Sequence, residues 1–189
     1  PTVAGMTARD HEVTLCDENV EEVDFDVEAD IVGVTGYIVH KQRMLEIVDE
    51  FRRRGRFVVI GGPYASLCPE ELRDRCDVLF VDEAEETWPQ FLLDFQAGSW
   101  RREYRPINKP DLTTSPTPRF DLLRVERYHA MTIQFARGCP YNCEFCDIIV
   151  VYGRRPRVKS IAQMMAEIEE CRRLGATQVF LVDDNFIGN

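Results

Sequence analysis

Apolar residues follow two periods in the first half of the chain. Short apolar runs are typical of buried strands, and elsewhere apolar residues recur at helical spacing. The predicted strands are residues 13–17, 30–36, 56–60 and 77–81, and the predicted helices are residues 2–8, 40–54, 69–75 and 85–95. Strands that alternate with helices indicate a parallel, doubly wound α/β sheet, whose strand-end loops meet at one edge.

A second alternation follows a proline-rich stretch. Four prolines and several threonines between residues 97 and 123 exclude regular helix and central strand, yet the aromatic residues there favour an ordered segment. Beyond it we predict strands at 131–136 and 178–182, and between them a helix at 161–174 with Ser160 as its N-cap. Cys171 lies on the apolar side of that helix and is expected in the core. The predicted parts are residues 1–96, a connecting segment 97–125, and residues 126–189.

Composition narrows the classes of protein that this chain could represent. The 189 residues carry a net charge of −10, which disfavours broad binding to nucleic acid. No apolar run approaches the length of about 20 residues that spans a membrane. Seven cysteines without any secretory signal suit a reducing compartment, so we expect a cytoplasmic protein.

The most specific motif follows the predicted strand at 131–136. Cys139, Cys143 and Cys146 stand at C-x3-C-x2-C spacing on one short loop. Three thiolates can hold three irons of a four-iron cluster and leave the fourth iron open for chemistry. A zinc site would need a fourth ligand, and a disulfide would leave an odd cysteine. An iron–sulfur cluster is therefore the favoured interpretation, with structural zinc as the alternative.

This cysteine motif resembles the signature of radical S-adenosylmethionine (SAM) enzymes. The resemblance implies a [4Fe-4S] cluster whose open iron binds SAM and whose electron yields a 5′-deoxyadenosyl radical. It also implies that Phe145 lies beside the adenine. Asp183, Asp184 and Asn185 would contact the amino group of SAM, although the family usually has Gly-Gly-Glu there and a helix N-cap cluster would use the same residue types.

Cationic residues lie close to the cysteine motif. Arg137 precedes the first cysteine and could tune the charge of the cluster environment. A run of four cations between the motif and the next helix could hold an anion or could form a solvated loop. Its members are Arg154, Arg155, Arg157 and Lys159.

Two loops of the first half resemble strand-end loops of cobalamin-binding domains. They are residues 34–37 and 60–66, which imply cobalamin contacts by Thr35, Gly36, Gly61 and Gly62. Glycine allows backbone to approach a flat macrocycle closely, but Gly-Gly after a strand is common in any doubly wound fold. A third segment, residues 81–87, departs from the family pattern by carrying Asp82 and Ala84 where glycines are common.

The chain as a whole resembles part of a cobalamin-binding radical SAM methylase of the hopanoid or bacteriochlorophyll type. This resemblance implies an incomplete Rossmann-like cobalamin-binding domain that lacks its first strand, followed by the first two strand–helix units of a radical SAM (β/α) barrel. The implied activity of the parent protein is methyl transfer from cobalamin to an unactivated carbon, and we expect the fragment itself to be inactive.

The resemblance also implies partners. These are a small-molecule, lipid or tetrapyrrole substrate and an electron donor such as a flavodoxin or ferredoxin. Two alternatives stay open: a radical SAM cyclase or oxidoreductase without methyl transfer, and a non-catalytic cobalamin- or flavin-binding module with structural zinc.

Overall fold

The computed structural model describes residues 1–187. These residues divide into two compact units, one of residues 24–110 and one of residues 1–23 together with the chain from residue 111 onward. Each unit has its own sheet and its own apolar core. The division at residue 110 falls inside the predicted connecting segment, and it joins the first 23 residues to the second half of the chain.

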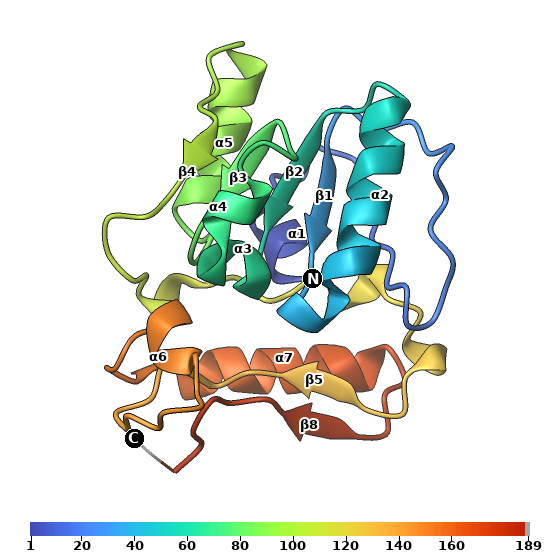
Figure 1. Ribbon diagram of the computed structural model, residues 1–189. Coiled ribbons are helices and arrows are strands. Elements are labelled where there is room, and N and C mark those ends of the chain that lie inside the picture. Colours follow the sequence, from blue (N-terminus) through green and yellow to red (C-terminus); the bar gives the residue numbers. More distant parts are fainter. Residues whose placement is uncertain (188–189) are drawn as a thin grey trace. The chain divides into compact units, whose positions relative to one another are not determined.

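The unit of residues 24–110 is built on a parallel sheet (Figure 1). Its strands lie in the order β1-β2-β3-β4, and Ile60 of β2 is the partner of both Val34 and Leu79. The predicted parallel α/β fold is confirmed, and three of the predicted strands correspond to β1, β2 and β3. The bounds are β1 (Val32–Thr35), β2 (Val58–Gly61), β3 (Val78–Phe80) and β4 (Glu103–Tyr104).

Helices connect these strands. The longest, α2, runs alongside β1 and buries Met44, Val48 and Phe51, which share one face because they are three or four residues apart (Figure 1). Two short helices separate β2 from β3 where one was predicted, because Pro63 begins a helix directly after Gly62. The bounds are α2 (Lys41–Arg53), α3 (Pro63–Leu67), α4 (Pro69–Leu72) and α5 (Thr87–Gln96).

An aromatic core packs between the sheet and α5. Val78 and Phe80 point to the same side of β3, since side chains alternate along a strand, and they pack against Phe91 of α5. Phe91 is fully buried, which contributes about 1.5–3 kcal/mol relative to exposure. Tyr104 of β4 joins this core and donates a hydrogen bond to Asp94 at 2.6 Å. The edge strand β4 was not predicted.

The other unit begins a second parallel sheet. Strands β5 (Met131–Ile133) and β8 (Val179–Leu181) pair in parallel, and α7 (Ile161–Arg173) lies beside them (Figure 1). Ser160 caps α7 as predicted, accepting a hydrogen bond from the Gln163 amide at 3.2 Å. Cys171 is fully buried in this core, as predicted.

Short elements complete this unit. A two-residue antiparallel pair flanks the cysteine motif, and neither strand was predicted. Besides three 3₁₀ turns between residues 112 and 127, these elements are α1 (Thr2–Met6), β6 (Ala136–Arg137), α6 (Ile148–Val151) and β7 (Arg157–Val158).

One predicted strand is wrong, and the connecting segment is ordered. Residues 13–17 form no strand, because no other described segment pairs with them, and Asp17 instead accepts a hydrogen bond from Tyr128 at 2.7 Å. Within the predicted connecting segment, Trp100 packs edge-on against Phe57, and Phe120 is buried in the core below β5. The prediction that this segment is ordered is confirmed.

Candidate metal centre and cofactor sites

The cysteine motif lies on the loop between β6 and β7, and its base is closed by backbone contacts. The Cys139 amide donates to the Gly153 carbonyl at 3.2 Å. Gly138 has a φ of +94°, and a Cβ there would lie 2.8 Å from the Arg155 carbonyl oxygen. Only glycine fits this position, because the neighbouring atoms are backbone and the φ disfavours L residues. Gly138 therefore brings the two arms of the loop together.

The three cysteines carry free thiols. Cys139 and Cys146 are half-buried, whereas Cys143 is exposed. Among residues 1–187 no three Cys, His, Asp or Glu side chains converge on a point that could hold a metal ion. The structure thus places the three sulfurs on one loop without gathering them. Three thiolates are nevertheless the soft donor set that iron–sulfur clusters use, so the residues fit a cluster by their chemistry.

The residues predicted to contact SAM lie in different surroundings in the structure. Phe145 is 93% exposed on the surface of the loop. Asp183 accepts hydrogen bonds from the Phe135 and Ala136 amides at 2.7 and 3.1 Å. Asp184 accepts one from the Gly138 amide at 2.8 Å. These two carboxylates therefore support the backbone that leads into the cysteine motif, a role that was not predicted, and their contact with SAM stays a prediction.

Asn185 reaches the first cysteine directly. Its side-chain amide nitrogen lies 3.4 Å from the Cys139 sulfur, where it donates a hydrogen bond. Asp184 and Asn185 thus contact the cysteine loop, and Asp183 contacts the backbone just before it. A cluster bound to Cys139 would have an amide donor against one of its sulfur ligands.

The cationic run does not behave as one feature. Arg154 donates to the Pro140 carbonyl at 3.1 Å and Arg157 to the Tyr152 carbonyl at 3.0 Å, so both brace the loop. Lys159 is buried and forms an ion pair with Glu167 of α7, with Nζ and Oε1 2.5 Å apart. The run is therefore not one solvated loop, and anion binding by the exposed Arg154 and Arg155 stays a prediction.

Sequence reasoning missed the importance of Glu167. Burial raises the pKa of its carboxyl, and the Lys159 ammonium opposes that shift only in part. Its second carboxylate oxygen is buried without a hydrogen-bond partner among the described residues. The signal was present in the sequence, because Glu167 shares the apolar face of α7 with Met164 and Cys171. A charged residue in an apolar stripe indicates a buried ion pair or a site.

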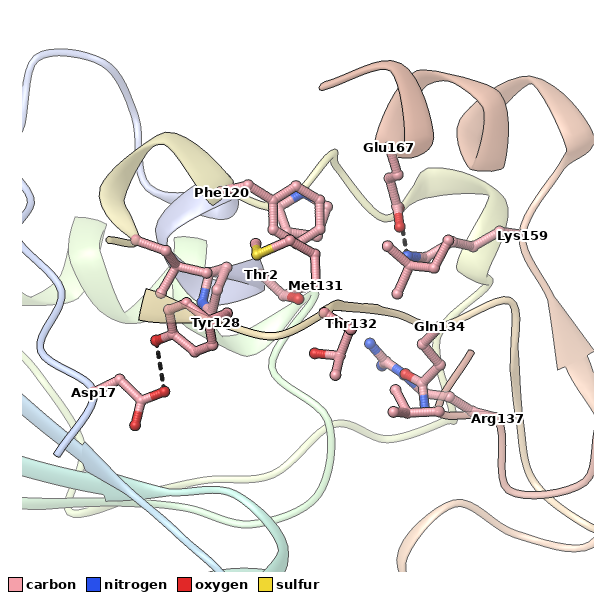
Figure 2. Close-up of a pocket in the computed structure, with 16 residues that line it drawn as sticks. Thr2, Asp17, Phe120, Tyr128, Met131, Thr132, Gln134, Arg137, Lys159 and Glu167 are labelled. Carbon is pink, nitrogen blue, oxygen red and sulfur yellow. Dashed lines mark hydrogen bonds and ion pairs between the residues drawn. The ribbon is translucent and has the colours of Figure 1, made fainter. Parts of the chain in front are cut away.

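A cavity of about 360 Å³ lies between these groups and Tyr128 (Figure 2). Figure 2 shows the Lys159–Glu167 pair at one side and the Tyr128–Asp17 hydrogen bond at the other. The β5 segment, with Thr132 exposed, runs between them. The other polar residues that line the cavity are Thr2, Gln134 and Arg137, and Arg137 donates a hydrogen bond to Gln134 at 2.9 Å. The cavity thus combines apolar walls with a charged end close to the cysteine loop.

The predicted cobalamin residues lie at the carboxyl ends of β1 and β2. A Cβ on Gly62 would lie 2.1 Å from the Thr35 hydroxyl oxygen, and one on Gly36 would lie 2.6 Å from the Met44 sulfur. Close packing inside the chain thus accounts for these two glycines without a ligand, as it does in other doubly wound folds. Their contact with cobalamin stays a prediction.

Exposed apolar residues continue directly from this edge. Tyr37, Ile38 and Val39 are 61%, 51% and 82% exposed, and they follow Thr35 and Gly36 without interruption. An apolar surface beside close-packed glycine loops fits one face of a macrocycle.

The third loop shows why glycine is common at residue 82. Asp82 has a φ of +69° and its amide donates to the Ser66 hydroxyl at 2.9 Å. Its carboxylate accepts from the Lys109 ammonium at 3.0 Å, which holds the strained residue in place. Asp82 therefore keeps the backbone conformation of a glycine while it adds a side chain at the same edge.

No helix among residues 1–187 is long and apolar enough to cross a membrane.

Comparison with known proteins identifies the class of the first part of the chain. Residues 2–92 match the family model of the B12-binding domain. The structure also superimposes on the methyltransferase TsrM from Kitasatospora setae, solved with cobalamin and a [4Fe-4S] cluster bound. That match has a TM-score of 0.64 at 18% identity and covers 85% of this chain and 39% of TsrM. The parallel α/β architecture is therefore that of a cobalamin-binding domain.

Curated relatives extend the comparison to the full chain. An uncharacterized methyltransferase of Synechocystis is 44% identical over 100% of this chain and 36% of its own length. The hopanoid C-2 methylase of Rhodopseudomonas palustris is 33% identical over 99% of this chain and 37% of its own. The bacteriochlorophyllide d C-8(2)-methyltransferase of Chlorobaculum tepidum is 31% identical over 90% of this chain and 40% of its own length.

These comparisons confirm the predicted resemblance. The chain carries a B12-binding domain and is a relative of the cobalamin-binding radical SAM methylases. It spans 36% to 40% of the length of these three relatives.

Proposed function

We propose that this chain supplies the cobalamin-binding and cluster-binding parts of a radical SAM methyltransferase. The observation that carries this proposal is the construction of the cysteine loop. Three free thiols stand on a loop that Gly138 closes at its base, that Asp184 and Asn185 contact, and that follows backbone held by Asp183. The B12-binding match and the methyltransferase relatives support the same reaction class.

Cys139, Cys143 and Cys146 would ligate three irons of a [4Fe-4S] cluster. When bound, the cluster would supply the electron that cleaves SAM to a 5′-deoxyadenosyl radical, and cobalamin would supply the methyl group. Phe145 is exposed and free to lie against the adenine of SAM. Asp183 and Asp184 already accept hydrogen bonds from backbone amides, so any contact with the amino group of SAM must use the remaining lone pairs of their carboxylate oxygens.

The cobalamin would lie at the carboxyl edge of the sheet in residues 24–110. Thr35, Gly36, Gly61 and Gly62 form the close-packed part of that edge, and the apolar side chains at residues 37–39 would cover one face of the macrocycle. In this arrangement the chain orients the cofactor and excludes water from one side of it.

The substrate and the partners are further parts of the proposal. The relatives that act on hopanoids and bacteriochlorophyllides support a lipid, tetrapyrrole or other small-molecule substrate with an unactivated carbon. A low-potential electron donor such as a flavodoxin or ferredoxin would reduce the cluster. The reducing conditions that such a cluster needs favour the cytoplasm.

The test is anaerobic reconstitution of the chain with iron and sulfide, followed by electron paramagnetic resonance of the reduced sample with and without SAM. We expect a signal of a reduced four-iron cluster that changes when SAM is added, because SAM would bind the open iron. A colourless, silent sample with stoichiometric zinc would refute the proposal and leave a cobalamin-binding module with a structural metal.

A further inference from the structure

The segment after β8 lies against the segment that carries the first cysteine. Ile133 of β5 is the register partner of Leu181 of β8, and the Val182 amide donates to the Ile133 carbonyl at 3.0 Å. Because the two strands are parallel, the chains that leave them continue side by side. Residues 183–185 therefore meet residues 135–139, although the two segments are more than forty positions apart in the sequence.

The three polar side chains of this segment differ in what they can donate. Asp183 and Asp184 are acceptors when ionised, and both accept hydrogen bonds from loop amides. Asn185 carries the donor of the three, and its amide nitrogen is the group that lies 3.4 Å from the Cys139 sulfur. In this segment, Asp183 and Asp184 therefore accept hydrogen bonds from backbone amides, and Asn185 donates one to sulfur.

A donor to a cysteine sulfur acts on a bound cluster through that ligand. Reduction adds negative charge that is shared by the cluster and its sulfur ligands. An N–H donor stabilises this charge more than it stabilises the oxidised form, which raises the reduction potential. The side chains of Asp183 and Asp184 cannot act in this way when ionised, because they have no proton to donate.

We propose that Asn185 is a positioning residue that sets the reduction potential of the cluster through Cys139, while Asp183 and Asp184 fix the loop backbone. This inference rests on the proposed function, because it requires a cluster on the three cysteines. It assigns Asn185 a task other than the predicted contact with the amino group of SAM.

The experiment is a redox titration, followed by electron paramagnetic resonance, of the reconstituted chain without SAM. Asn185→Leu keeps a similar volume and removes the donor, and Asn185→Asp places an acceptor and a charge at the same site. Phe186→Leu is the matched control, because it changes the exposed neighbour that has no role in the proposal. Iron and sulfide are counted in every sample.

We expect all four proteins to hold four irons. Asn185→Leu loses one net hydrogen bond to the reduced cluster, so its equilibrium constant for reduction should fall about tenfold. For one electron this lowers the reduction potential by about 59 mV. Asn185→Asp should shift in the same direction and by more, and Phe186→Leu should match the wild type.

The outcomes separate this inference from the proposed function. A wild-type chain that binds no iron–sulfur cluster would refute the function itself. Loaded wild type and Asn185 variants with equal potentials would overturn the inference and leave the function intact. Loss of iron from both Asn185 variants, without any shift in a residual cluster, would make Asn185 a structural residue and would also overturn it.

Discussion

The two strand-end regions of this chain are held together in different ways. At the edge of the first sheet, glycines bring loops so close together that added side-chain atoms would collide, as between Gly62 and Thr35. At the cysteine loop, carboxylates and an amide hold backbone and sulfur through hydrogen bonds. The first region is shaped by the absence of side chains, whereas the second depends on polar side chains together with one close-packed glycine, Gly138. A substitution that adds volume at a close-packed glycine should therefore damage either region, whereas the loss of a charge should damage chiefly the second.

The largest effect on the free energy of unfolding should come from the buried Lys159–Glu167 ion pair. Lys159→Met leaves Glu167 in a buried site without its counter-ion, and breaking such a pair costs about 3–5 kcal/mol of unfolding free energy. Denaturant unfolding monitored by circular dichroism would measure this change. Lys159→Met combined with Glu167→Leu is the matched control, and it should recover most of the loss. No recovery in the double variant would mean that the residues matter through shape alone.

Gly138→Ala should destabilise the chain by about 2–4 kcal/mol. Its φ of +94° disfavours alanine, and the added Cβ meets the Arg155 carbonyl, which is backbone and cannot rotate away. Gly55→Ala is the control, because Gly55 has a similar φ of +76° but open space around it, so about 1 kcal/mol is expected there. Equal losses in the two variants would show that the backbone angle, and not the closed loop base, accounts for the effect.

Gly62→Ala should cost about 1–3 kcal/mol, less than Gly138→Ala. Its φ of +92° is almost the same, but the colliding atom is the Thr35 hydroxyl oxygen, which can turn aside. Thr35→Ala in the same chain should return the loss to the level of Gly55→Ala. A double variant as unstable as Gly62→Ala alone would refute the claim that the two strand ends pack against each other at this pair.

The smallest effect is a pH dependence at Glu167. Burial raises the pKa of this carboxyl in the folded chain, so the folded state holds the proton more tightly than the unfolded state. Its contribution to stability is then present below the unfolded pKa and declines as the pH rises through the folded pKa. Relative to Glu167→Gln, the wild type should lose at most about 1.4 kcal/mol per pH unit in that window. A difference that grows with pH would show that the Lys159 pair outweighs burial.

Local patterns predicted the elements whose stability comes from their own apolar faces. The stripe of Met44, Val48 and Phe51 predicted α2, and Ser160 predicted the start of α7. Residues 13–17 have the composition of a strand but no described partner, and pairing is not a local property. The two-residue strands β6 and β7 were missed for the same reason, because they exist only through each other.

The site was predictable as far as its chemistry follows from spacing. The C-x3-C-x2-C spacing predicts the three cysteine ligands, whereas the contact of Asn185 with Cys139 depends on the register of β5 and β8. The residue types at 183–185 suit binding of an ammonium group as well as they suit hydrogen bonding to the cysteine loop. Composition alone therefore could not distinguish these two roles. Lys159 was grouped with exposed arginines, and its partner on α7 became visible only in the folded chain.

The central claim is that Cys139, Cys143 and Cys146 together hold one four-iron cluster. The most direct measurement is the iron and acid-labile sulfide bound per chain after anaerobic reconstitution, compared between the wild type and single alanine variants of these cysteines. Cys171→Ala, which removes a buried core thiol, is the control. We predict about four irons and four sulfides in the wild type and in Cys171→Ala, and almost none in the three loop variants. Full iron content in any one of those loop variants would contradict the account.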